Sequence, residues 1–263
     1  MGEHYKLERI DRKLGGKNTT MTSTTEMQIE ELEDRIQLYN VPVPYDGGEL
    51  HNIGWRKKLL NGGACLTQDE HIRRTRDKEF KLPSGLVYGA TILALFELID
   101  TEGRPGKARE ALEELLLNKD ADNFSGIITS TRIRYTSQGP DIVFHDYSYS
   151  HMRQQSVDMI RPPWWPMDIF SNRDILQALF GTRRITKFRN ALNMRDGNFT
   201  YDSLCSDDRV RPRQDAVRVF GFSSFTYHTS AINAAKRVAD LGLARGVIVT
   251  PSSLHQKNLR RRT

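Results

Sequence analysis

The sequence predicts an α+β protein with a helical N-terminal half, a central antiparallel β-hairpin and a C-terminal βαβ-like segment. Three observations carry this prediction. The longest apolar run, 86–99, has fourteen residues and one charge, and this composition is typical of a buried helix. The run is too short to span a bilayer, because that needs about 20 apolar residues. Two stretches rich in β-branched and aromatic residues, 126–136 and 141–147, flank a Gly-Pro turn. A helical pattern at 229–241 lies between two strand-like runs.

The apolar run is expected to be the central core helix, because its apolar positions are not confined to one stripe. Ser84 precedes the run and can cap the helix by accepting a hydrogen bond from a backbone amide. Gly89 leaves a small surface that another element can approach closely. A second helix is predicted over 107–118 from its apolar spacing, and the short link predicts an antiparallel helix pair.

The N-terminal half is expected to begin with a short amphipathic helix, because Met27, Leu32, Ile36 and Tyr39 fall near helical spacing. Alternating prolines follow and end this helix. In the second half of the chain, helical patterns at 172–180 and 182–193 predict two further helices.

The last unit predicts a βαβ arrangement, with strands at 216–222 and 246–250 on either side of the helix at 229–241. Before these elements, Trp164 and Trp165 stand among three prolines in a segment that cannot be regular structure.

The net charge of +6 belongs to the two ends of the chain, with +4 in the last ten residues and +2 in the first twenty. The body is neutral but polarised. Residues 26–50 carry seven acids against one base, whereas residues 55–81 carry eight bases against four acids. We expect these two regions to meet, or one of them to face an external anion.

We favour a single α+β domain over residues 26–252, with a subdivision near residue 122 as the alternative. A disordered lead is expected at 1–25 and a basic tail at 253–263.

Cysteine and hydropathy patterns indicate a cytoplasmic protein without membrane contact. Cys65 and Cys205 have no metal-ligand spacing and are expected to be buried thiols in a reducing compartment. The first eighteen residues lack the apolar region of a signal peptide.

A first candidate site comprises His145, Asp146 and His151. Their side chains are of the types that bind a divalent metal or act as a general base. The spacing matches no known zinc or iron signature, and on a straight strand His145 and Asp146 would point to opposite faces. We therefore assign no metal, and polar hydrogen bonding at a strand end is the competing interpretation.

A second candidate site is a phosphate site at the start of the predicted C-terminal helix. A helix N-terminus offers backbone amides and a positive dipole end. The segment contains neither a Walker A motif nor GxGxxG, and plain helix capping is the alternative. The residues of this site are Ser223, Ser224, Thr229 and Ser230.

A third candidate site is a nucleic-acid surface, built from arginines on the β-hairpin and a stacking tyrosine. Charges on an edge strand that merely prevent aggregation are the alternative. Trp55 with its neighbouring bases suggests a further phosphate contact, or a solvated surface packed by the tryptophan. The residues of the surface are Arg132, Arg134, Tyr135, Arg183, Arg184, Lys187, Arg260, Arg261 and Arg262.

The leading functional hypothesis is an intracellular, non-enzymatic nucleic-acid-binding or nucleic-acid-associated protein. One alternative is a metal-dependent hydrolase of phosphate-containing substrates. Another is an assembly protein that docks a protein partner or a second copy through Trp164 and Trp165 or the acidic N-terminal helix. The sequence leaves open whether the protein is an enzyme, and it identifies no cofactor.

Overall fold

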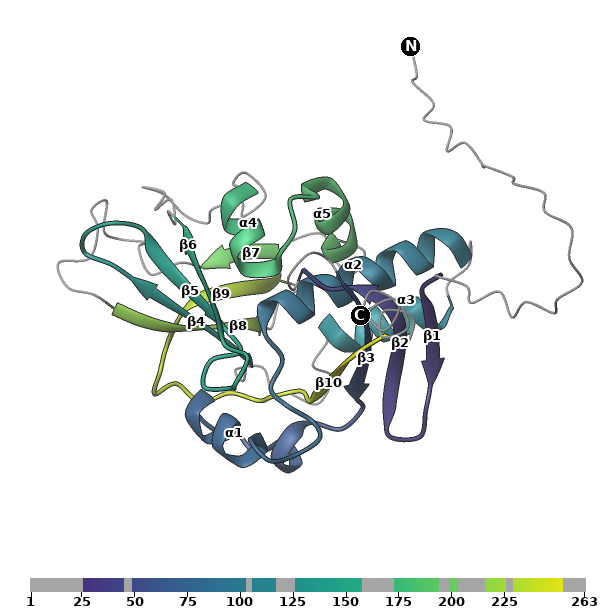
Figure 1. Ribbon diagram of the computed structural model, residues 1–263, viewed down its shortest axis with the longest axis horizontal. Helices are drawn as coiled ribbons and strands as arrows, with labels where there is room; N and C mark the ends of the chain where they lie inside the picture. The colour runs from purple at the N-terminus through teal and green to yellow at the C-terminus, as the bar shows by residue number, and fades with distance from the viewer. Residues whose placement is uncertain are drawn as a thin grey trace, which may run out of the picture.

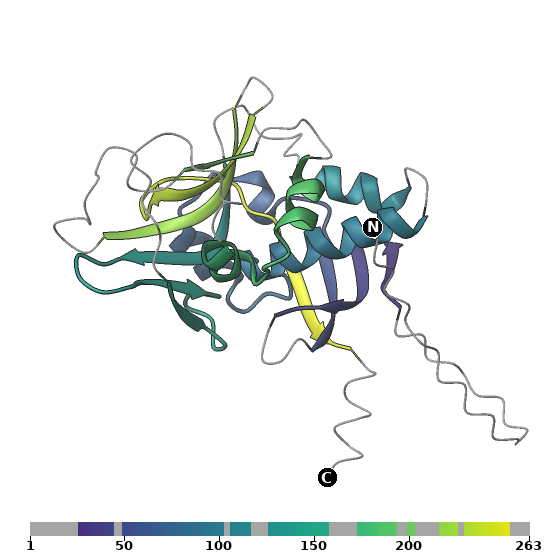
Figure 2. The same cartoon turned by 90° about the horizontal axis from the view of Figure 1, so that it is seen from above.

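The computed structural model describes residues 26–44, 49–102, 106–116, 126–157, 173–193, 199–202, 216–225 and 229–252. Within these ranges the chain forms five α-helices, one short 3₁₀ helix and two β-sheets (Figure 1). The sheets lie side by side (Figure 2), and the longest helix begins near their junction and extends over the four-stranded sheet. None of the helices in these ranges combines the length and apolar character needed to cross a membrane.

The first sheet is antiparallel and joins the start of the chain to its end. Its strand order is β1-β2-β3-β10, and the strands are β1 (Gln28–Glu31), β2 (Arg35–Pro42), β3 (Leu50–Arg56) and β10 (Val247–Pro251). This sheet brings the acidic and basic regions together, as predicted, because Lys57 Nζ lies 2.8 Å from Glu31 Oε1.

The predicted N-terminal helix is wrong, because its residues form β1 and β2. The helical spacing of Leu32 and Ile36 does not come from one continuous element, because Leu32 lies in the turn between the two strands, where its amide donates to the Arg35 carbonyl at 2.9 Å. Pairing of Ile36 with Trp55 and of Leu38 with Ile53 favours a strand over a helix.

The second sheet has six strands in the order β6-β5-β4-β8-β9-β7. Its strands are antiparallel except for the β7 and β9 pair. They are β4 (Ile127–Tyr135), β5 (Asp141–His145), β6 (Arg153–Val157), β7 (Phe199–Asp202), β8 (Ala216–Phe225) and β9 (Thr229–Arg237). The predicted hairpin is confirmed as β4 and β5.

The predicted βαβ segment is also wrong. Residues 229–237 form strand β9, which pairs with β8 in a hairpin, and β10 belongs to the other sheet. The alanines of this segment favour a helix locally, but pairing with β8, in which Ile232 lies opposite Phe222, overrides that preference. The helices are therefore not concentrated in the N-terminal half, and the predicted fold class is corrected to a strand-rich mixture of two sheets and five helices.

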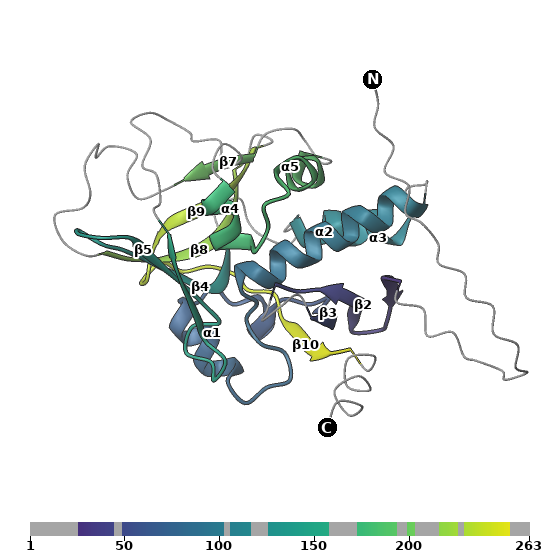
Figure 3. The same cartoon turned by 45° about the horizontal axis from the view of Figure 1, so that its top comes forward.

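The central helix is confirmed as α2 (Gly85–Glu102). It packs against α3 (Lys107–Leu116), α4 (Arg173–Phe180) and α5 (Ile185–Asn193). With α3 it lies across one face of the four-stranded sheet (Figure 3). One core cluster joins α2 to both sheets, through Leu38 and Ile53 on one side and Ile133 and Phe220 on the other. The remaining helices are α1 (Gln68–Thr75) and the 3₁₀ turn η1 (Leu60–Gly63).

The start of α2 differs from the sequence prediction. The Ser84 hydroxyl is buried without a hydrogen-bond partner, so it is not the cap. The first helical amide, that of Gly85, donates to Thr131 Oγ1 at 2.9 Å instead. The close approach predicted at Gly89 is confirmed, because the backbone of Phe180 from α4 lies against it.

Three further predictions concern residues elsewhere in the chain. Cys65 is exposed, so the expectation of a buried thiol is wrong for this residue. Cys205, Trp164, Trp165 and both predicted end segments lie outside the described residues.

Candidate functional site

A cleft of about 390 Å³ lies where β10 faces the turn between β5 and β6 (Figure 1). The edge of β10 forms one wall, and Val247 exchanges two backbone hydrogen bonds of 2.9 Å with Lys81. Leu82 and Val87 add an apolar floor. The cleft therefore joins segments from both sheets with the approach to α2, and its size is in the range of small-ligand sites.

Asp146 is the buried acid of the cleft. It follows β5 directly and has a left-handed backbone, with φ of 51°, which bends the chain away from the strand direction. The Tyr147 amide donates to the Ser130 carbonyl at 2.9 Å, and the Tyr149 amide donates to the Asp146 carbonyl at 3.0 Å. Ser130 Oγ donates to Asp146 Oδ1 at 3.4 Å. These bonds hold the carboxylate at the inner side of the cleft.

His151 lies opposite this carboxylate, with Nε2 at 3.7 Å from Asp146 Oδ2. Its side chain is 55% exposed, whereas that of Asp146 is 6% exposed. The imidazole is parallel to the Tyr149 ring, with centroids 6.0 Å apart and an angle of 7°. The pair thus combines a fixed, buried carboxylate with an imidazole that substrate and solvent can reach.

Tyr149 is held rigidly beneath His151. Its hydroxyl accepts from the Leu82 amide at 3.1 Å and lies 3.0 Å from Thr75 Oγ1. Since Thr75 Oγ1 donates to the His71 carbonyl at 2.8 Å, the tyrosine hydroxyl is the donor to Thr75. Burial raises the pKa of Tyr149. This residue is therefore a neutral support for the imidazole.

His51 on β3 is the second imidazole of the cleft and is 8% exposed. Its Nδ1 lies 2.9 Å from the Glu49 carbonyl, so the hydrogen is on Nδ1 and Nε2 is the basic nitrogen. Lys81 and Arg153 add positive charge to the cleft, and Glu49 and Glu79 add negative charge. Lys81 Nζ lies 5.5 Å from the centre of the Tyr149 ring.

No family model, curated protein or solved structure matches the chain.

The structure does not bring the three predicted catalytic residues together. Asp146 and His151 share the cleft, but His145 points into the core, where Nδ1 lies 3.0 Å from Thr131 Oγ1 and Nε2 lies 2.7 Å from the Ala178 carbonyl. Burial lowers the pKa of His145 to about 4. No group of three His, Cys, Asp or Glu side chains that could hold a metal occurs within the described residues.

The predicted nucleic-acid surface on the hairpin is not formed, because Arg132 and Tyr135 are buried. Arg132 bonds to Gln68 and Asp69 and lies 3.9 Å from the centre of the Tyr147 ring. A register irregularity in β4 between Ile128 and Arg132 accompanies this inward position. Arg134 remains exposed.

The other predicted cations form exposed ion pairs or lie outside the described ranges. Arg183 Nη2 lies 3.5 Å from Asp174 Oδ1. Glu97 Oε1 lies 2.8 Å from Arg184 Nη1 and 3.2 Å from Lys187 Nζ. Arg260, Arg261 and Arg262 belong to the segment that the structure does not describe.

The predicted phosphate site loses its structural basis. Ser223, Ser224, Thr229 and Ser230 lie on β8 and β9, so no helix N-terminus is present at this point to supply backbone amides.

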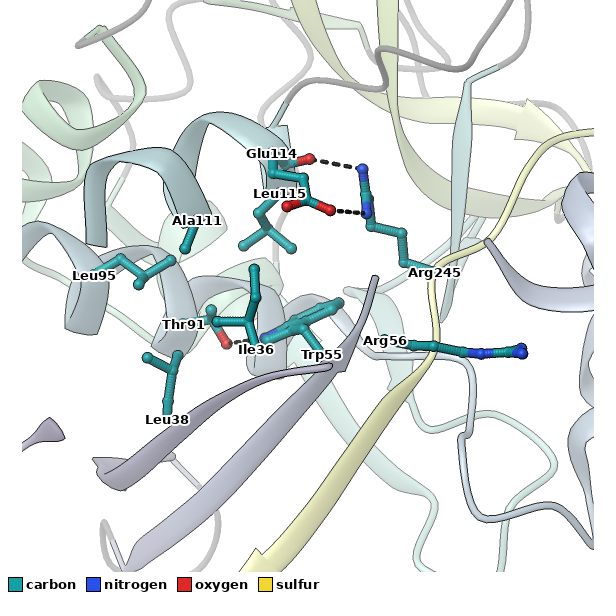
Figure 4. A pocket seen from close by; sticks show the side chains of 10 residues that line it. All are labelled: Ile36, Leu38, Trp55, Arg56, Thr91, Leu95, Ala111, Glu114, Leu115 and Arg245. Carbon is teal, nitrogen blue, oxygen red and sulfur yellow. Dashed lines mark hydrogen bonds and ion pairs between the residues drawn. The ribbon is translucent and has the colours of Figure 1, made fainter. Parts of the chain in front are cut away.

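Trp55 is buried, and its Nε1 donates to Thr91 Oγ1 at 3.0 Å, so this ring cannot stack on a base. It lines a void of about 20 Å³ (Figure 4), which is room for about one water molecule. Arg245 reaches Glu114 across this void, with Nη2 at 2.7 Å from the carbonyl and Nη1 at 3.6 Å from Oε1.

Sequence reasoning missed His51, Lys81, Tyr149 and Arg153. The density of aromatic and basic residues in 147–153 was an available signal. The contribution of β3 and Lys81 was not visible, because it depends on pairing between the two ends of the chain.

Proposed function

We propose that the protein is an acid–base enzyme acting on phosphate-containing substrates, with the cleft as its active site. One observation carries this proposal: the Asp146 and His151 pair shares one cleft with a second imidazole and two cations. Paired titratable groups and cations that converge on one cavity are the usual features of a catalytic site.

His151 and Asp146 have complementary roles in this proposal. With Nε2–H directed at Asp146, Nδ1 of His151 is the nitrogen that accepts a proton. The carboxylate fixes the orientation of the ring and stabilises the imidazolium that forms. Lys81 and Arg153 stabilise negative charge that develops on phosphoryl oxygens.

The test is a turnover assay on a panel of phosphate esters, namely monoesters, diesters, cyclic nucleotides, RNA and DNA. We expect His151→Gln to lower turnover about 100-fold or more, because general acid–base catalysis contributes about 10²- to 10⁴-fold. Asp146→Asn should lower it as well, since the amide no longer stabilises the imidazolium. Arg173→Gln, at an exposed position on α4 outside the cleft lining, is the matched control and should keep full activity.

Two outcomes would contradict the proposal: no turnover of any ester, or turnover that both cleft variants retain. Thermal unfolding of each variant shows whether a loss of activity reflects loss of the fold.

Non-enzymatic binding of nucleic acid stays a prediction. It rests on Arg134, Arg183, Arg184 and Lys187 within the described ranges, and the last three are in ion pairs. Docking of a protein partner and a cytoplasmic location likewise stay predictions.

A further inference from the structure

In the proposed function the imidazoles and carboxylates of the cleft act as acids, bases and charge partners, so they do not serve as covalent nucleophiles. None of the described residues that line the cleft is a serine, threonine or cysteine. The Tyr149 hydroxyl is engaged with Leu82 and Thr75. Attack on phosphorus therefore falls to water or to a hydroxyl group of the substrate itself.

A run of basic residues leads from the cleft along the end of α1. Residues 73–81 carry five bases against two acids, and Arg73, Arg74, Arg76 and Lys78 are exposed. The Nη2 atoms of Arg73 and Arg74 also lie 3.9 and 3.6 Å from Glu70 Oε1. The Lys81 ammonium donates to the Arg76 carbonyl, which ties this run to the cleft. An extended polyphosphate chain can contact both the run and the cleft, whereas a single phosphate ester fills only the cleft.

From these two observations we infer that the substrate is single-stranded RNA and that its own 2′-hydroxyl is the nucleophile. The inference rests on the proposed acid–base function and specifies its substrate. A cleft of about 390 Å³ has room for about one unstacked nucleotide. The 2′-hydroxyl distinguishes RNA from DNA, and it supplies a hydroxyl nucleophile, whereas no serine or threonine is among the described residues that line the cleft.

The reaction needs one base and one acid, which the two imidazoles provide. His151, supported by Asp146, removes the proton of the 2′-hydroxyl as O2′ forms its bond to phosphorus. The bond between phosphorus and O5′ breaks, and protonated His51 gives its proton to O5′. Lys81 and Arg153 stabilise the charge on the non-bridging oxygens.

The products are one fragment ending in a 2′,3′-cyclic phosphate and one beginning with a 5′-hydroxyl. One proton is taken and one is given, and no water is consumed in this step.

The experiment compares three oligonucleotides of identical sequence: all-ribose, all-deoxyribose, and deoxyribose with a single ribose. Each is incubated with the full chain in water enriched in ¹⁸O, and the products are identified by mass spectrometry. We expect the mixed strand to be cut only after its ribose, and its first product to be a cyclic phosphate without ¹⁸O. The all-deoxyribose strand should remain intact.

His151→Gln, purified in parallel, should lower the rate about 100-fold or more, which also excludes a contaminating nuclease. His151 is largely exposed, so this variant should fold even if His51→Gln, at a buried position, does not. Arg173→Gln, at an exposed position on α4 away from the cleft lining, should cut at the wild-type rate.

The outcomes separate the inference from the proposed function. Cleavage of the all-deoxyribose strand, or ¹⁸O in the first product, would show attack by water and overturn the inference while the acid–base function stands. If other phosphate esters are turned over while all three oligonucleotides stay intact, the inference is likewise overturned and the acid–base function stands. If no phosphate ester is turned over, both fail.

Discussion

At the residue scale, the buried polar side chains that looked functional in the sequence link the elements of the fold. The Gly85 amide donates to Thr131 Oγ1. His145 Nε2 faces a carbonyl, which can only accept, so Nε2 carries the hydrogen and Nδ1 accepts from Thr131 Oγ1. The Nε2–H of His145 then donates to the Ala178 carbonyl. One neutral imidazole thereby joins the start of α2, strands β4 and β5, and α4.

This neutral imidazole predicts a loss of stability in acid. Burial lowers the pKa of His145 from 6.5 to about 4, so the unfolded chain binds more protons between these values. Stability from this residue is fully present above pH 6.5 and is lost as the pH falls toward 4, by about 3 kcal/mol. The lowered pKa of buried His71 acts in the same direction.

The measurement is urea unfolding of the wild type and His145→Gln at pH 7.5 and pH 4.5. The variant, which cannot titrate at this position, should lose less stability between the two pH values. An equal loss in both proteins would contradict this account.

Arg132 and Arg134 provide a second test at the residue scale. Both are arginines on β4, but Arg132 is buried and Arg134 is exposed. Arg132→Ala should lower the free energy of unfolding by about 3 kcal/mol, since it leaves buried Gln68 without its charged partner. Arg134→Ala, at an exposed position, should change it by less than about 0.5 kcal/mol. Equal effects in chemical denaturation would show that Arg132 is not a structural residue.

At the element scale, segments defined by their own composition were predictable, and those defined by pairing were not. The run that became α2 is apolar on all sides, and the β4 and β5 hairpin has its turn and its β-branched residues in sequence. In contrast, β1, β2 and β9 contain apolar spacings or alanines that also suit a helix, and neighbouring strands decide their structure. Asp146 and His151 were found from the sequence because one turn holds both, whereas His51 lies on a strand far away along the chain.

The contact between α2 and α4 gives the prediction at this scale. Gly89→Ala should improve helix propensity by about 1 kcal/mol. However, the new Cβ would lie 2.7 Å from Phe180 Cβ and even closer to the Phe180 carbonyl oxygen, and this backbone cannot move aside easily. We expect a net loss of about 1–3 kcal/mol. Thr186→Ala, on the exposed side of α5, is the control, and its free energy of unfolding should equal or exceed that of the wild type. A Gly89→Ala variant as stable as the wild type in chemical denaturation would contradict the close packing of α2 and α4.

At the scale of the whole molecule, the cleft exists because the end of the chain returns to its beginning. Strand β10 pairs with β3 and with Lys81, and this closes the first sheet against the β5 and β6 turn of the second. The segment that follows β10 carries Lys257 and three consecutive arginines, a charge of +4. Because β10 lines the cleft, this charged segment is joined to the chain just after a strand of the proposed RNA site.

Removal of residues 253–263 should therefore weaken RNA binding without changing the reaction in the cleft. Each phosphate contact that is lost should lower the slope of log affinity against log salt by about 0.7 for a single strand. We expect KM to rise at low salt and kcat at saturating RNA to stay unchanged, because every cleft residue remains. Kinetics at several salt concentrations, with a full-length chain in which the four basic residues are changed to glutamine as control, would test this. A fall in kcat in both proteins would mean that the tail takes part in the chemistry, whereas an unchanged salt slope would mean that phosphate contacts come from the body of the protein.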